Sequence, residues 1–425
     1  MNIYATVILV SLLLEFGVRL IVAHLSLISL LRKPAESFAD LIDRDRYHQL
    51  QRYTAARTRL RAGSEGSYLA VLLLFWFNGG FRLLDRSIEN WGFAPLVTGV
   101  LVIGAIAIGR ALVALPFAAY FTFRIEGRFG FNNTTPQTFL SDLLKGTLVA
   151  AAVGGPVLAA ILALLGGTGR YSWVYAWSLV AGVCVLLEIL APQVILPLFN
   201  KFEPIKNRQL QEAISSYAAS VDFPLAAVSV MDASTRSSKS NAFFTGLGSN
   251  HRLVLEDTLI SRHTVPELVA ITAHEVGHFK QRHIPLRVSI EILQLGLFFL
   301  LMSLFLNRQG LFLAFYVGQP SVHLGVVFFT LLYSPVAFGW SILVNWIARK
   351  QEYAADAFAA NTAGATADLA EALRKLAADN YTQLAPHRFD VFLNYSHPTL
   401  RDRIRALSAS DRSSEQLTIC GKGTA

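Results

Sequence analysis

Residues 93–123 read FAPLVTGVLVIGAIAIGRALVALPFAAYFTF, an apolar run whose one charged residue is Arg110. A helix needs roughly 20 such residues to cross the hydrocarbon core of a bilayer, and this run is longer. Six other runs are also long and predominantly apolar, although Asn78, Gly79, Gly80 and Arg82 interrupt the run 67–86. The seven spans that we predict are 3–31, 67–86, 93–123, 143–166, 171–199, 285–306 and 322–348. We therefore predict an all-α membrane protein with seven transmembrane helices.

The composition agrees with this class of fold. Hydrophobic residues make up 53% of the chain and charged residues 16%, which is too little charge to cover soluble domains of this size. The net charge of +8 is concentrated in the segments between alternate runs. The positive-inside rule explains this pattern, so it indicates membrane orientation rather than nucleic-acid binding. It places the N-terminus outside and the C-terminus in the cytoplasm.

Two polar regions interrupt the membrane bundle. We expect a bundle of helices over 1–199, a cytoplasmic segment over 200–284, two further spans over 285–348, a catalytic segment over 349–408 and a polar tail over 409–425. The first polar region begins with an amphipathic helix at 207–221. Three short strand-like runs follow, at 227–231, 241–245 and 252–255, and they predict a small antiparallel sheet.

One motif in the first polar region carries chemistry. His274, Glu275 and His278 form the HExxH pattern on a predicted helix, which starts at a capping box between Thr264 and Glu267. Positions i and i+4 share one helix face, so both imidazoles can reach a single zinc ion. Glu275 is then the general base that takes a proton from the metal-bound water. The alternative is a helix with two surface histidines.

A catalytic zinc site needs a third protein ligand. Glu352 and Asp356 lie four residues apart on a predicted helix, so Glu352 can bind the metal while Asp356 orients a bound imidazole. On the residues alone, a solvated acidic pair is the commoner explanation. His283 is the rival ligand, but it follows His278 by five positions and is expected to rotate away from the metal, as an interfacial residue.

At this point the chain resembles the type I CAAX prenyl proteases, which are integral-membrane zinc metalloendopeptidases. The resemblance extends from the first cytoplasmic loop to about residue 407. The matching motifs outside the zinc site are 52–54, 57–59, 129–136, Asp142, 145–146, 197–200, 240–246 and 396–398. It implies seven transmembrane helices that enclose a chamber, and one zinc ion per chain.

The resemblance also implies roles for individual residues. Glu352 is the third zinc ligand and Asp356 supports a zinc-bound imidazole. His397 stabilises the oxyanion of the tetrahedral intermediate, and Arg403 braces the glutamate ligand. The substrate-binding edge strand, which pairs with an extended peptide, consists of Asn241, Ala242, Phe243, Phe244 and Thr245.

Charged residues also occur within the membrane runs, among them Glu15, Arg19, Arg110, Glu188 and Glu291. Such charges normally face protein or water, and we expect several of them to line the chamber; Glu15 and Arg19 can also pair at i, i+4. The resemblance is to a bacterial member, so we expect a multi-pass protein of the bacterial inner membrane. Its active site faces the cytoplasm, and its substrates are peptides or proteins, prenylated or not.

Three other functions stay open. A general quality-control protease would cleave damaged or misassembled membrane proteins. A site-2-type intramembrane protease also carries HExxH, but its motif lies within the apolar core, and here the motif lies outside it. A non-catalytic chaperone, receptor or translocation partner is disfavoured because every catalytic position is intact.

Overall fold

The structure is a computed structural model that describes residues 2–31, 44–167, 169–245, 251–364 and 366–409. Most of the predicted polar tail therefore lies outside the described residues. The helices of the membrane half are α1 (Ile3–Ser29), α2 (Arg44–Phe77), α3 (Gly80–Glu89), α4 (Pro95–Tyr120), α5 (Pro136–Gly167), α6 (Ser172–Leu190), α11 (His283–Phe305), α12 (Gln309–Leu313), α13 (Val322–Leu332) and α14 (Ser334–Ala363). Short π-helical segments, Phe121–Glu126 and Ala191–Ile195, extend α4 and α6.

The membrane-spanning capacity matches the predicted class. Within the described residues, five helical segments are long and apolar enough to span a bilayer, and the number rises to seven if each of two bent pairs counts as one span. α2 and α3 meet at 67°, at the position where Gly79 adopts a left-handed conformation with φ of 70°. α13 and α14 meet at 55°. The all-α membrane fold is confirmed, and the enclosed chamber stays a prediction.

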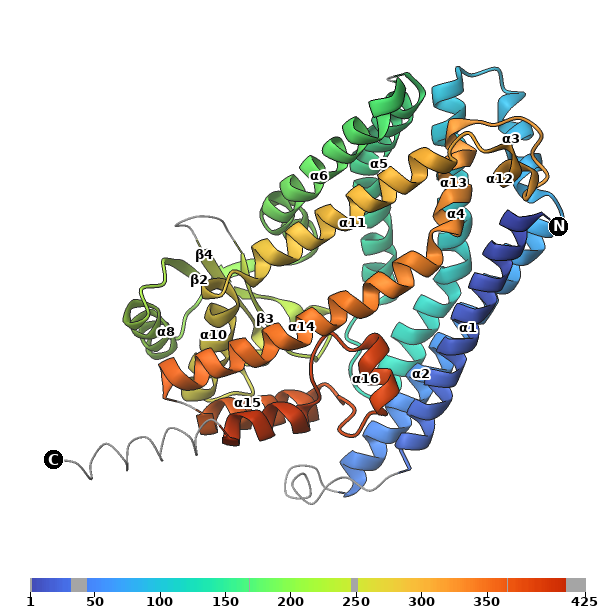
Figure 1. Ribbon diagram of the computed structural model, residues 1–425. Helices are drawn as coiled ribbons and strands as arrows, with labels where there is room; N and C mark the ends of the chain where they lie inside the picture. The colour runs from blue at the N-terminus through green and yellow to red at the C-terminus, as the bar shows by residue number, and fades with distance from the viewer. Residues whose placement is uncertain (1, 32–43, 168, 246–250, 365, 410–425) are drawn as a thin grey trace, which may run out of the picture.

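An aromatic core joins the membrane helices at the end of the molecule near the N-terminus (Figure 1). Trp76 of α2 donates a hydrogen bond to the Ala314 carbonyl at 2.8 Å, so the residues after α12 are held against the end of α2. Phe315 stacks on Phe328 of α13 with ring centroids 4.0 Å apart. Phe81 of α3 packs edge-on against both rings. This core lies at the end of the molecule opposite the sheet.

The sheet lies at the other end and has the strand order β1-β2-β4-β3. Its strands are β1 (Phe202–Pro204), β2 (Leu225–Met231), β3 (Ala242–Thr245) and β4 (His251–Glu256). β2 and β4 run parallel, whereas the other two pairs are antiparallel. The prediction of a purely antiparallel sheet is therefore wrong. Apolar alternation in short strands shows which face is buried but carries no information on strand direction.

The remaining helices surround this sheet. They are α7 (Leu196–Phe199), α8 (Arg208–Ser220), α9 (Asp257–Ile260), α10 (Val265–Lys280), α15 (Thr366–Asp379) and α16 (Arg388–Asn394), and 400–409 is also helical. α10 starts at the predicted capping box, in which Thr264 and Glu267 bond reciprocally. The C-terminal end of α10 crosses α14 (Figure 1). A Cβ at Gly277 would lie only 3.1 Å from the Cα of Ala355, so glycine permits this close crossing.

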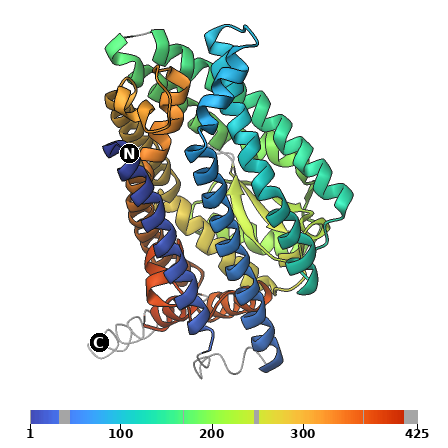
Figure 2. The same ribbon diagram turned by 90° about the vertical axis from the view of Figure 1, so that its right-hand side faces the viewer.

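A bidentate ion pair connects the membrane half to the sheet half. Arg236, in the turn after β2, donates to both carboxylate oxygens of Asp142 on α5, at 2.8 and 3.1 Å. The Arg236 carbonyl accepts the backbone N–H of Asn133 at 3.0 Å. Lys239 bonds Glu126 and the Tyr53 hydroxyl, so the turn also reaches the π-helical end of α4 and α2. Figure 2 shows the molecule from the side on which α1 and α2 lie.

Candidate metal centre

The two histidines of the HExxH motif converge on the α10 face that meets α14. His274 is buried and His278 half-buried. Their Nε2 atoms lie 3.2 Å apart, as expected for residues one helical turn apart on one face. Ala273 and Val276 occupy the opposite, buried face of the helix against Leu369 of α15 and Leu407. Packing on that side therefore fixes the rotation of the helix that presents the imidazoles.

The crossing of α14 brings Glu352 to the same point. Its carboxylate oxygens lie 3.6 Å from His274 Nε2 and 3.3 Å from His278 Nε2. One ligand atom from each of these residues lies within 4.8 Å of the others. The buried Oε2 of Glu352 accepts no hydrogen bond from the described residues, although Arg403 Nη1 lies 3.2 Å away. Two nitrogens and an under-coordinated buried carboxylate oxygen fit a divalent cation with one open position.

The outer nitrogens of both imidazoles are also held. Asp356 lies 2.9 Å from His274 Nδ1 through its Oδ1. Arg403 in turn donates to Oδ1 and Oδ2 of Asp356, at 2.6 and 2.8 Å. A partner on the outer nitrogen fixes the tautomer and orientation of a metal-binding imidazole. Asp356 therefore contacts the imidazole of His274, and Arg403 lies closer to Asp356 than to Glu352.

His283 occupies a position that the sequence analysis did not foresee. Its Nδ1 lies 3.0 Å from Nδ1 of His278, and its side chain is buried. It contacts the outer nitrogen of His278 rather than lying at an interface, and it is not one of the three residues whose ligand atoms converge. The turn between α10 and α11 explains this, because Arg282 has a left-handed φ of 57° and interrupts the helix. A five-residue spacing judged on a continuous helix misses such a break.

Glu275 lies beside the ligands on the same helix. Burial raises the pKa of its carboxyl above the ordinary value, against the opposing charges of His274 and His278. Burial alone would disfavour the charged form of His278, but the hydrogen bond and the charge of Glu352 leave its pKa raised. A bound cation needs this imidazole neutral, so metal and proton compete for it. Glu275 has the raised proton affinity that a general base and acid requires.

His397 lies on the open side of the centre. Its Nε2 is 3.3 Å from Oε1 of Glu352, and its side chain is 64% exposed. The segment that carries it is anchored to α14, because Arg349 donates to the carbonyls of Val391 and Tyr395 at 3.1 and 2.6 Å. An N–H donor on the solvent side of the ligands can reach a substrate oxygen without disturbing the ligands.

The predicted substrate-binding residues lie at an edge of the sheet. Ala242, Phe243, Phe244 and Thr245 form β3, and Asn241 precedes it with its carbonyl bonded to the Glu256 N–H at 3.2 Å. β3 pairs with β4 on one side and, in the described part of the chain, with no strand on the other. It also contacts α10, the helix of the HExxH motif. An extended peptide can add to such an edge next to the centre.

Comparisons with known proteins cover nearly the whole chain. Residues 24–201 match the family described as CAAX prenyl protease N-terminal, five membrane helices, and residues 204–411 match peptidase family M48. A CAAX prenyl protease 1 homolog of Oryza sativa subsp. japonica is 36% identical over 82% of this chain and 81% of its own length. The human CAAX prenyl protease 1 homolog is 32% identical over 87% of this chain and 86% of its own length.

A solved structure shows the same fold. The crystal structure of S. mikatae Ste24p superposes with a TM-score of 0.91 at 28% identity, and the match covers 96% of this chain and 99% of that one. The fold, the two consecutive family matches and the His–His–Glu group agree with one another. The chain therefore belongs to peptidase family M48, as a multi-pass membrane metalloendopeptidase related to the CAAX prenyl protease 1 homologues.

Proposed function

We propose that this chain is a zinc endopeptidase that cleaves CAAX-type or other membrane-associated proteins at the cytoplasmic face of the membrane. The observation that carries the proposal is the convergence of His274, His278 and Glu352, with Glu275 on the same helix as the histidines. Two imidazoles and one carboxylate are a ligand set characteristic of catalytic zinc. When bound, zinc polarises the scissile carbonyl and makes a bound water acidic.

The residues of the chain supply the remaining steps. Glu275 takes the proton from the attacking water and returns it to the leaving amine, and its raised pKa favours the first of these transfers. His397 donates an N–H to the oxyanion that forms at the carbonyl. Asp356 and Arg403 hold His274 in place while charge develops. β3 aligns the peptide through its backbone, which leaves the side chains of the substrate largely unspecified.

The proposed orientation follows from the charges between the spans. Basic residues crowd the segments that lead into and out of the protease portion, which indicates a cytoplasmic location for α10, α15 and the helix at 400–409. We propose that 200–284 and 349–408 act together as the protease portion, since each contributes ligands to one centre. A bacterial inner membrane is the proposed location.

The substrate class can be tested with two peptides. A farnesylated CAAX-type peptide and its unmodified twin are incubated with the protein in detergent, before and after chelation and with zinc restored. If the enzyme recognises the peptide backbone, it should cleave both peptides. This cleavage should be lost on chelation and recovered when zinc is restored. A preference for the farnesylated peptide would assign prenylated substrates. Failure to cut either peptide at one bound zinc would contradict the proposed substrates and favour a non-catalytic homologue.

A further inference from the structure

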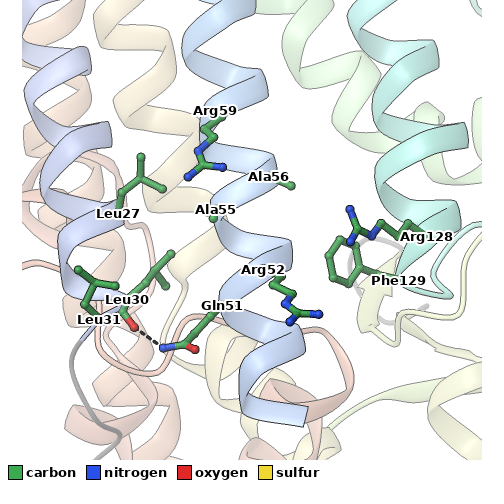
Figure 3. A pocket seen from close by; sticks show the side chains of 10 residues that line it. All are labelled: Leu27, Leu30, Leu31, Gln51, Arg52, Ala55, Ala56, Arg59, Arg128 and Phe129. Carbon is green, nitrogen blue, oxygen red and sulfur yellow. Dashed lines mark hydrogen bonds between the residues drawn. The ribbon is translucent and has the colours of Figure 1, made fainter. Parts of the chain in front are cut away.

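A pocket of about 410 Å³ lies between the last turns of α1, the middle of α2 and the residues that follow the π-helical end of α4. Three arginines surround it, Arg52 and Arg59 from α2 and Arg128 from the third segment (Figure 3). Leu27, Leu30 and Phe129 form its apolar part. The Gln51 amide donates to the Leu30 carbonyl and ties the two helices together at its lower rim. The pocket is therefore lined by both basic and apolar side chains.

The positive charge of this pocket is not neutralised by the described residues. No aspartate or glutamate lines it, and Arg52, Arg59 and Arg128 form no ion pair with any described residue. Other arginines of α2 do have partners: Arg46 pairs with Asp379 at 2.8 Å and Arg61 with Glu65 at 2.9 Å. Three like charges around one concavity repel one another unless an anion lies between them. Arginine's fork of N–H donors suits a phosphate group in particular.

Arg52 and Arg59 lie on a face of α2 next to the face that supports the protease portion. Tyr53, next to Arg52, points to Glu126 and Lys239 at the junction between the two halves. Arg52, Arg59 and Arg128 are all exposed. The pocket is thus distinct from the metal centre, and nothing in the proposed peptide hydrolysis uses it.

The pocket lies at the predicted cytoplasmic end of the first span, because Leu27, Leu30 and Leu31 line it. The 27 residues of α1 extend about 40 Å at ~1.5 Å per residue, whereas the hydrocarbon core is roughly 30 Å thick, so the last turn of α1 lies near the headgroups. Ile28 is 44% exposed and Leu31, just after α1, is 84% exposed, so apolar surface continues beside the pocket. An apolar wall with arginines at headgroup depth fits an amphiphile with a negatively charged head.

We propose that this pocket binds the phosphate-bearing headgroup of an anionic phospholipid in the leaflet that we assign to the cytoplasm. The phosphate lies between Arg52, Arg59 and Arg128, and an acyl chain follows Leu27 and Ile28 along α1. Basic pockets between membrane helices on the cytoplasmic side are suited to such headgroups. Bound there, the lipid links α1 and α2 to the segment after α4, beside the junction with the protease portion.

Binding can be measured with the delipidated full-length protein in neutral detergent. Native mass spectrometry follows the titration of phosphatidylglycerol and of phosphatidylcholine with the same acyl chains. The test variant combines Arg52→Gln, Arg59→Gln and Arg128→Gln. A matched variant removes the same charge elsewhere through Arg61→Gln, Arg86→Gln and Arg208→Gln. A third arm adds sn-glycerol 3-phosphate, which has the phosphate without acyl chains.

We expect the wild type to bind one phosphatidylglycerol more tightly than phosphatidylcholine. The test variant should weaken that step on the order of a hundredfold, at roughly fivefold per arginine, and the matched variant should not. If the triple variant does not fold, Arg59→Gln alone should show the fivefold loss. Equal binding of the two lipids, or an unchanged affinity in the test variant, overturns the proposal. Displacement of the lipid by millimolar glycerol 3-phosphate would also overturn it, because the site would then recognise free anions.

Discussion

Arg403 holds three groups of the metal centre at once. Its guanidinium donates to both oxygens of Asp356, lies 3.2 Å from Glu352 and reaches His274 Nδ1 at 3.4 Å. It is buried, whereas its neighbours Arg401 and Arg405 are exposed. The spacing of Leu400, Arg403 and Leu407 marks one buried helix face, a sign in the sequence that this arginine differs from the others. Its partners could not be derived, because they lie 47 or more residues away.

Replacing Asp356 by asparagine tests the support of His274. The amide would keep the size of the side chain but lose the charge that orients the imidazole and neutralises Arg403. The zinc affinity should fall about 10–100-fold, as measured by competition with a chromogenic chelator. Asp402→Asn serves as the control, since Asp402 is exposed and its hydrogen bonds within the described residues go to Thr399. Unchanged affinity in Asp356→Asn would contradict this support.

Glu256 predicts a pH dependence of stability. Burial raises the pKa of this carboxyl from 4.5 to about 7. The folded state then binds more protons than the unfolded state between these values, so the free energy of unfolding falls as pH rises from about 4.5 to about 7. The full shift corresponds to about 3 kcal/mol, and solvent screening of this partly exposed carboxyl reduces it, so the metal-free wild type should lose on the order of 2 kcal/mol relative to Glu256→Gln over this range. The same difference in the free energy of unfolding between the two proteins at pH 5 and at pH 8 would contradict this prediction.

Helix crossings decide where the third ligand lies. The motif on α10 and the acidic pair on α14 can each be recognised in the sequence, but their meeting depends on Gly277 fitting against the backbone at Ala355. Short strands limited the prediction of the sheet in a similar way: the burial of β2 and β4 could be predicted from their apolar residues, whereas their parallel direction could not. Tertiary packing, rather than local pattern, determines both arrangements.

Gly277→Ala tests the crossing of α10 and α14. The added Cβ would approach the Cα and carbonyl oxygen of Ala355 to 3.1 Å, so the helices must separate. We expect a loss of about 1–3 kcal/mol of stability together with weaker zinc binding, because Glu352 moves with α14. Gly63→Ala is the matched control: a Cβ there meets nothing within 4 Å, and alanine favours a helix. Equal thermal stability and zinc content in both variants would argue against a tight crossing.

At the scale of the whole molecule, the protease portion is assembled from segments on either side of two membrane helices. In the sequence, α10 precedes α11 and α14 follows α13. The chain therefore runs through two predicted spans between the two histidine ligands and Glu352. The spans could be predicted from hydropathy. The family resemblance indicated which residues form the site, but not how the helices that carry them pack. The junction through Arg236 and Asp142 required the folded structure, because the two residues are 94 positions apart.

A double-mutant cycle measures this junction. Asp142→Asn and Arg236→Gln should each lower thermal stability in detergent, and the double variant should lose less than the sum of the two. We expect a coupling energy of roughly 1–2 kcal/mol for the half-buried bidentate pair. The exposed pair of Arg208 and Glu212 provides the comparison, with about 0.5 kcal/mol or less. Strict additivity at Asp142 and Arg236 would show that this pair does not join the halves.

The most direct test of the central claim is the rate of peptide cleavage by Glu275→Gln at one bound zinc per chain. Glutamine leaves His274, His278 and Glu352 in place, so the variant should bind zinc as the wild type does. Without a carboxylate to move the proton, its turnover should fall on the order of 10²–10⁴-fold. Wild-type turnover in the zinc-loaded variant would contradict the role of Glu275 and with it the proposed mechanism.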